Sequence, residues 1–123
     1  MPRDTLKMLT QRLRDFAAAR DWEQFHSPKN LVMALAAESG ELLEHFQWLT
    51  DEQSRELDDS QRELVAAELA DVLLYLLRLA DRLGIDLEVA AERKIAVNEQ
   101  RYPAERVRGS AKKYTEYQET PGA

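Results

Sequence analysis

The sequence predicts an all-α fold, a bundle of four main helices that assembles as a homo-oligomer. Leucines recur at intervals of three, four and seven residues in the long segments, which is the spacing of a helix with one buried face. No stretch longer than a few residues alternates as a β-strand does. Small polar or acidic residues precede the periodic segments, and glycine or proline follows two of them, as at helix ends.

Composition favours one ordinary domain over 1–123. Of the 123 residues, 44% are hydrophobic and 33% are charged, and the formal net charge of −6 argues against nucleic-acid binding. Cysteine is absent, so disulfides and thiol chemistry are excluded, which fits a reducing compartment. The N-terminal segment has no apolar signal core, and no apolar run is long enough to cross a bilayer. We therefore expect a cytoplasmic protein without membrane partners.

The first two helices are expected over residues 4–20 and 28–49. Segment 21–26 between them is rich in aromatic and polar residues and lacks helical period. Ser27 is a suitable N-cap, and Pro28 suits the first helical position that follows it. The apolar stripe of the first helix comprises Leu6, Leu9, Leu13 and Phe16.

The third helix is expected over residues 61–83, after an acidic surface connection at 50–59. Ser60 and Glu63 have the spacing of a capping box, and Gly84 is placed to end the helix. This helix is apolar on nearly all sides, which predicts burial by a second subunit.

The fourth helix is expected over 87–101, with Asp86 as its cap. Residues 104–123 lose helical period and read as a basic, partly flexible tail in an otherwise acidic chain. The tail cations are Arg106, Arg108, Lys112 and Lys113. The sequence supports two interpretations of this tail about equally: a segment that contacts polyphosphate, or a solvated, disordered end.

Two pairs of acids interrupt the two most apolar stretches. Glu38 and Glu41 lie one turn apart in the second helix, and Glu68 and Asp71 repeat the spacing in the third. Neither stretch contains a lysine or arginine that would neutralise them, although buried ion pairs with other segments are the alternative reading. Carboxylates in dry surroundings need a counter-charge, and hard oxygen ligands suit Mg²⁺, with Mn²⁺ as the second choice. We predict a divalent-cation site that acts on a phosphate substrate.

Aromatic residues near these acids have two readings. The candidates for stacking on a base are Trp22, Phe25, Trp48 and Tyr75, but aromatic residues at helical spacing more often belong to the core. His26 is more often a hydrogen-bonded structural histidine than a catalyst.

These residues together resemble the all-α nucleoside triphosphate pyrophosphatases, the MazG-like superfamily. Glu38-x-x-Glu41 followed by Glu68-x-x-Asp71 is similar to the metal-binding signature of that superfamily. The segments around these acids are similar to its dCTP pyrophosphatase branch, over roughly residues 6–115. They are 20–26, 40–42, 46–48, 71–73, 101–103 and 113–115. Many members of the superfamily carry a glutamate doublet where this chain has Ala37 before Glu38, and the dCTP branch shares this absence. Leu13 stands where close relatives in the dCTP branch carry a histidine.

The resemblance implies a reaction and roles for individual residues. It implies Mg²⁺-dependent hydrolysis of dCTP, or of modified or other dNTPs, to the monophosphate and pyrophosphate, for housecleaning of the nucleotide pool. The acids Glu38, Glu41, Glu68 and Asp71 would hold the metal and carry catalysis. Substrate contacts would come from Trp22, His26, Trp48, Tyr75, Lys94, Asn98, Arg108, Lys112 and Tyr114.

The resemblance also implies a homotetramer, built as a dimer of dimers. Two alternatives to dCTP hydrolysis remain at this point. One is a related pyrophosphohydrolase with another substrate, such as phosphoribosyl-ATP. The other is a non-catalytic helical partner protein whose acids form buried ion pairs.

Overall fold

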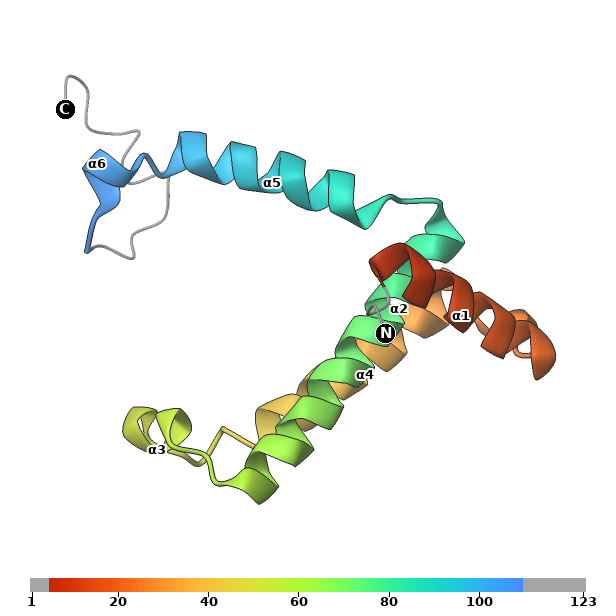
Figure 1. Cartoon of the computed structure of the whole chain (residues 1–123), viewed down its shortest axis with the longest axis horizontal. Helices are drawn as coiled ribbons and strands as arrows, with labels where there is room; N and C mark the ends of the chain where they lie inside the picture. The colour runs from red at the N-terminus through yellow and green to blue at the C-terminus, as the bar shows by residue number, and fades with distance from the viewer. Residues whose placement is uncertain (1–4, 110–123) are drawn as a thin grey trace. The chain divides into compact units, whose positions relative to one another are not determined.

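The structure is a computed structural model that describes residues 5–109, and this part of the chain is helical without strands (Figure 1). The prediction of an all-α fold is therefore confirmed. Four long helices occupy the places expected for them: α1 (Leu6–Ala19), α2 (Pro28–Glu44), α4 (Asp59–Leu83) and α5 (Leu87–Arg101). Three short elements join or follow them: η1 (Glu23–Phe25), α3 (Asp51–Arg55) and α6 (Ala104–Val107).

The chain divides after Ile85 into two compact units. In the first unit, α4 is the central element, and both α2 and α1 pack against it. Figure 1 shows α2 running alongside α4. The small apolar core of this unit comprises Ala17, Leu31, Val65, Leu77 and Ala80. This packing brings the two acid-bearing helices, which are separated in sequence by α3, against each other.

The N-terminal caps follow the chemistry of the sequence, with one correction. Ser27 Oγ accepts a hydrogen bond from the Asn30 backbone N–H, as predicted for the start of α2. The predicted capping box of α4 is wrong by two residues: Asp58, and not Ser60, is the N-cap, and Gln61 completes the box. Aspartate caps a helix at least as well as serine, so α4 begins at Asp59, two residues earlier than expected.

The connection between α2 and α4 contains more structure than expected. Helix α2 ends at Glu44, and short turns follow it, so the predicted end at 49 was too late. The segment expected to be an irregular surface connection contains α3, which is stabilised by a capping box of Thr50 and Gln53. The capping signal of Thr50 and Gln53 was present in the sequence, but the segment that forms α3 has no apolar period.

Helix α4 ends at Gly84, which adopts a left-handed conformation with φ of 67°. The second unit contains α5, capped by Asp86, and then α6 in the segment predicted to lack period. Among residues 5–109, no helix combines the length and the apolar character needed to cross a membrane.

Candidate metal centre and adjoining pocket

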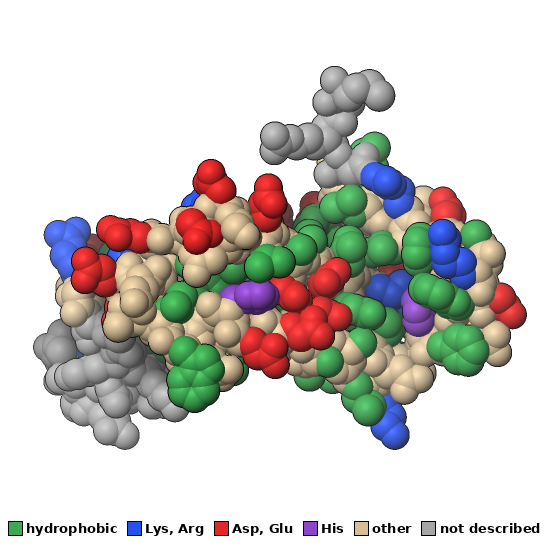
Figure 2. All heavy atoms as spheres, turned by 90° about the horizontal axis from the view of Figure 1, so that it is seen from below, with side chains coloured by type: hydrophobic (Ala, Val, Ile, Leu, Met, Phe, Trp, Pro, Cys, Tyr) green, Lys and Arg blue, Asp and Glu red, His purple; other side chains and the backbone are tan. Residues whose placement is uncertain are grey.

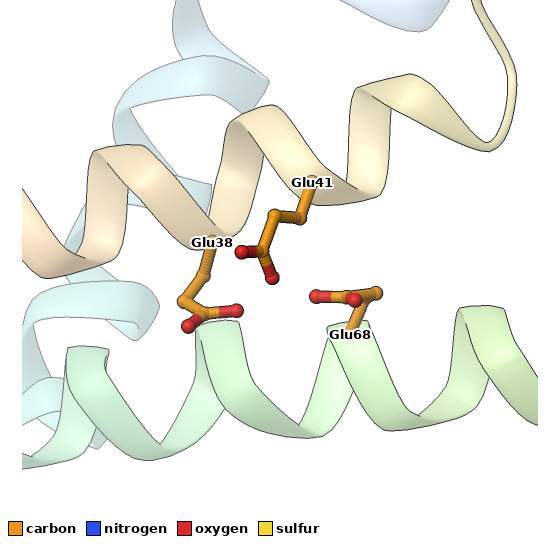
Figure 3. A group of neighbouring side chains, drawn as sticks. All are labelled: Glu38, Glu41 and Glu68. Atoms are coloured by element: carbon orange, nitrogen blue, oxygen red, sulfur yellow. The ribbon is translucent and has the colours of Figure 1, made fainter.

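Three carboxylates converge in the first unit. Glu38 and Glu41 project from α2 and Glu68 from α4, and the three side chains point toward one another between the two helices (Figure 3). One oxygen of each carboxylate lies within 4.8 Å of the other two. Acidic side chains gather near the middle of the face shown in Figure 2. The structure thus brings together three of the four acids that the sequence predicted as metal ligands.

The electrostatics of this cluster are unfavourable without a counter-charge. One buried oxygen each of Glu38 and Glu68 has no hydrogen-bond partner. Burial, then the neighbouring Glu41, and then Asp71 and Glu68 raise the pKa of Glu38 from 4.5 to about 7. Orphaned acceptor oxygens at this spacing fit a hard divalent cation, because it supplies the missing positive partner.

The raised pKa of Glu38 predicts how stability without metal depends on pH. Between 4.5 and about 7 the folded state keeps a proton on Glu38 that the unfolded chain releases. The free energy of unfolding should therefore fall as pH rises through this window and level off above it. Urea unfolding in EDTA across this range should show the fall, and Glu38→Gln should weaken it. A slope that Glu38→Gln leaves unchanged would contradict the assigned pKa.

Asp71 lies one turn beyond Glu68 on α4 and belongs to the wall of a pocket. It is not part of the three-carboxylate cluster, although its charge contributes to the raised pKa of Glu38. The pocket has a volume of about 510 Å³ and lies between α1, α4 and the α1–α2 connection. Through Asp71, the acidic cluster and the pocket adjoin each other.

The pocket combines an apolar wall with a few polar groups. Its aromatic members include Trp22 and Tyr75, which were predicted to surround a base. Trp22 is held by an edge-to-face contact with Phe16, with ring centroids 5.6 Å apart. The turn after α1 directs Trp22 there, because Asp21 adopts a positive φ of 53°. His26 lines the same pocket, as do Leu9, Arg12, Leu13, Leu74 and Arg78.

Other predicted substrate residues lie elsewhere. Trp48 is 86% exposed and is not among the residues that line the pocket. Lys94, Asn98 and Arg108 belong to the second unit, the first two on α5 and the third just after α6. Two further predictions, Lys112 and Tyr114, fall outside the described residues.

Sequence reasoning missed three polar residues. Arg12 and Arg78 line the pocket, and His45 Nε2 lies 3.8 Å from Glu68 Oε1. A signal for Arg78 was available: it lies four and seven residues from positions 74 and 71, on the face of α4 that carries Asp71 and Tyr75. Arg78 directly follows the apolar run that we read as ending at residue 77.

The chain is similar to several known proteins. The model of the MazG-like family matches residues 33–117. The human protein named dCTP pyrophosphatase 1 is 49% identical over 117 residues, which is 94% of this chain and 69% of the human one. The Bos taurus protein of the same name is 48% identical over 114 residues, or 91% of this chain and 68% of its own.

A solved structure shares the fold. The crystal structure of a pyrophosphatase from Archaeoglobus fulgidus superposes with a TM-score of 0.76 at 38% identity, and the match covers 84% of this chain and 96% of that one. The acidic cluster of this chain is a group of residues that could hold a metal ion. On the family model and on relatives of this identity and coverage, the chain belongs to the MazG-like family.

Proposed function

We propose that this protein is a Mg²⁺-dependent nucleoside triphosphate pyrophosphohydrolase that converts dCTP to dCMP and pyrophosphate. The observation that carries the proposal is the cluster of Glu38, Glu41 and Glu68, with two unpartnered buried oxygens, beside an aromatic pocket. The names of the human and bovine relatives support dCTP as the substrate.

The residues present fit Mg²⁺, with Mn²⁺ as the alternative. Glu38, Glu41 and Glu68 offer only carboxylate oxygens, and Asp71 can complete the set from the next turn of α4. When bound, Mg²⁺ neutralises phosphate charge and lowers the pKa of an attacking water. His45 beside Glu68 adds a nitrogen donor at the edge of the cluster.

The pocket residues have the task of orienting the nucleotide. Trp22 and Tyr75 flank the space where a base can stack, and Asp71 lies on the path from there to the carboxylate cluster. A base gripped in this pocket holds the α phosphorus closer to the cluster than the γ phosphorus. Water then adds to the α phosphorus, the bond from this atom to the bridging oxygen breaks, and pyrophosphate departs. We assign stabilisation of this leaving group to the cations Lys94, Arg108 and Lys112. We assign further polar contacts with the substrate to Asn98 and Tyr114.

The test of this function is the identity of the products. Incubation of dCTP with the protein and Mg²⁺, followed by ³¹P NMR, should show dCMP and pyrophosphate in equal amounts and no dCDP at any time. The diphosphate dCDP should be a poor substrate, because part of the leaving group is missing. Accumulation of dCDP with orthophosphate would overturn the proposal.

We also propose that the two units form one catalytic domain and that the protein assembles as a homotetramer, a dimer of dimers. The match to the family model extends across both units, which supports the first point. Large apolar side chains on α2 and just after it are exposed, including Met33 at 60% and Leu43 at 58%, and Trp48 at 86%. Such surfaces usually become buried in an interface.

Oligomer formation is directly measurable. Light scattering coupled to size-exclusion chromatography at micromolar concentration should give a mass close to four times the 14.2 kDa of one chain. Met33→Asp should reduce this mass, because a charge in an apolar interface is costly. An active protein that elutes as a monomer would contradict the assembly.

A further inference from the structure

A buried arginine in the wall of the pocket contacts the histidine that lines the same pocket. Among the described residues, Arg78 is the only buried charged side chain, at 4% exposure. Its Nε–H donates a hydrogen bond of 3.1 Å to His26 Nδ1, and its Nη1 donates one of 3.2 Å to Asp81. Arg78 therefore connects a carboxylate on its own helix to an imidazole on the α1–α2 connection.

This hydrogen bond determines where the imidazole carries its proton. Arginine is always a donor, so His26 Nδ1 must accept and cannot itself be protonated. Burial, together with the positive charges of Arg78 and Arg82, lowers the pKa of His26, and Glu23 opposes this only in part. At neutral pH the ring is thus neutral, and its proton lies on Nε2.

The surroundings hold both partners in place. Arg82 Nε–H donates a 3.1 Å hydrogen bond to the His26 carbonyl oxygen, which ties the backbone of the connection to α4. The His26 ring meets Trp22 edge-on, with centroids 6.5 Å apart. Asp81, the carboxylate partner of Arg78, is itself held by two hydrogen bonds from Arg14 on α1. Few rotations remain open to the His26 ring.

Half of the residues that line the pocket cannot donate a hydrogen bond to a ligand. Leu9, Leu13, Phe16 and Leu74 are apolar, and Asp71, when ionised, only accepts hydrogen bonds. The donors on this wall are His26, the guanidinium groups of Arg12 and Arg78, the Trp22 indole N–H and the Tyr75 hydroxyl. A planar heterocycle in this space needs a donor for its carbonyl oxygen or ring nitrogen, and a fixed neutral imidazole supplies one.

We propose that Arg78 is a positioning residue that holds His26 as the neutral Nε2–H tautomer, so that the pocket presents a fixed N–H donor to an acceptor atom of the substrate's base. The inference rests on the proposed function for the presence of a base. It adds that Arg78 fixes the tautomer of His26, and that His26 selects a base edge that carries a hydrogen-bond acceptor.

The tautomer is measured first, on the protein without substrate. Long-range ¹H–¹⁵N correlation spectra should show His26 with a pyridine-like Nδ1 and a pyrrole-like Nε2 at neutral pH. The chain contains two histidines, so His45→Gln identifies the His26 signals. In Arg78→Lys, which retains a cation beside Asp81 but lacks the Nε–H donor, the two tautomers should mix. A pyrrole-like Nδ1 in the natural protein would overturn the inference.

Selectivity is measured next, as the ratio of kcat/KM for dCTP to that for a triphosphate with a phenyl ring in place of the base. The phenyl ring stacks but offers no acceptor atom. Arg78→Lys and His26→Phe should each lower this ratio about five- to tenfold, the range expected for one hydrogen bond. The double variant should fall no further than His26→Phe alone, because both changes remove the same contact.

Arg14→Gln is the matched control. It breaks the other side of the Asp81 network and leaves the Arg78–His26 hydrogen bond intact, so its tautomer and its selectivity ratio should be those of the natural protein. An unchanged ratio in Arg78→Lys, or an equal loss in Arg14→Gln, would overturn the inference.

If the protein hydrolyses no triphosphate, the proposed function fails by itself. Titration with dCMP then decides the inference: the His26 Nε2 signal must move, and an unmoved signal refutes it.

Discussion

Glu41→Gln is expected to lower kcat/KM for dCTP by about a hundredfold or more, while the protein stays folded. The change keeps the shape of the side chain but removes one of three converging carboxylate charges. A bound metal contributes several kcal/mol of charge stabilisation in the transition state, and each 1.36 kcal/mol is about tenfold in rate. Steady-state assays of pyrophosphate release at several Mg²⁺ concentrations measure the effect. Asp71→Asn should behave similarly.

A loss of metal binding should be distinguishable from a loss of structure. Without metal the acids repel one another, so Glu41→Gln should unfold in EDTA at the same temperature as the natural protein or a higher one. Mg²⁺ should stabilise Glu41→Gln less than it stabilises the natural protein. Glu44→Gln is the control, because Glu44 is exposed on the same helix and lies outside the cluster. Near-normal activity of Glu41→Gln at saturating Mg²⁺ would refute the metal site.

Asp81→Asn is expected to have the largest effect on stability, about 2 to 4 kcal/mol. The substitution removes the nearer carboxylate of the buried Arg78 guanidinium and leaves only Glu23, whose Oε1 is 4.0 Å from Nη2 and whose side chain is exposed. Removing one partner of a buried ion pair is strongly destabilising. It also removes the charged partner of Arg14, which joins α1 to α4. Urea unfolding at neutral pH measures the loss. Glu63→Gln is the control, since Glu63 is exposed on the same helix, and it should change stability by less than about 0.5 kcal/mol.

The effect of Asp81→Asn should depend on pH in a defined direction. Hydrogen bonding from Arg14, with further attraction from Arg14 and Arg78, lowers the pKa of Asp81 below 3.8. A carboxylate whose folded pKa is lowered contributes stability above its unfolded pKa and loses it as pH falls through the folded value. The difference between the natural protein and Asp81→Asn should therefore be full at neutral pH and shrink below about pH 3.8. A difference that persists undiminished in acid would show that the carboxylate charge of Asp81 is not responsible for the loss.

The fold class and the long helices followed from local properties of the chain. Helix α5 runs from Leu87 to Arg101, the bounds that the sequence predicted, because its aspartate cap and terminal Tyr-Pro are short-range signals. Where two capping signals competed, at Ser60 and Asp58, the local reading chose wrongly. The element that lacked apolar period, α3, was missed because its stability comes from caps and not from an amphipathic face.

The acids of the candidate metal centre were visible in the sequence because charges in apolar runs are exceptional. The sequence predicted only part of how these acids are arranged, because their spacing along each helix indicated two equivalent pairs. The structure instead brings Glu38, Glu41 and Glu68 together and leaves Asp71 to the pocket. The angle and register at which α2 meets α4 decide this, and those depend on the packing of many side chains at once.

The sequence by itself determined the helical class, the N-caps of α2 and α5 and the four acids, since each depends on residues within about one or two turns of one another. Only the tertiary structure decided that Arg78 lies beneath His26, that Asp81 links Arg78 to α1, and that Trp22 and Tyr75 share one pocket. These partners are 52 to 67 residues apart in the two hydrogen bonds concerned. Such contacts form because a buried polar group is stable only when it is hydrogen-bonded, and its partner can come from a distant segment of the chain. The local sequence pattern does not indicate which distant residue that partner is.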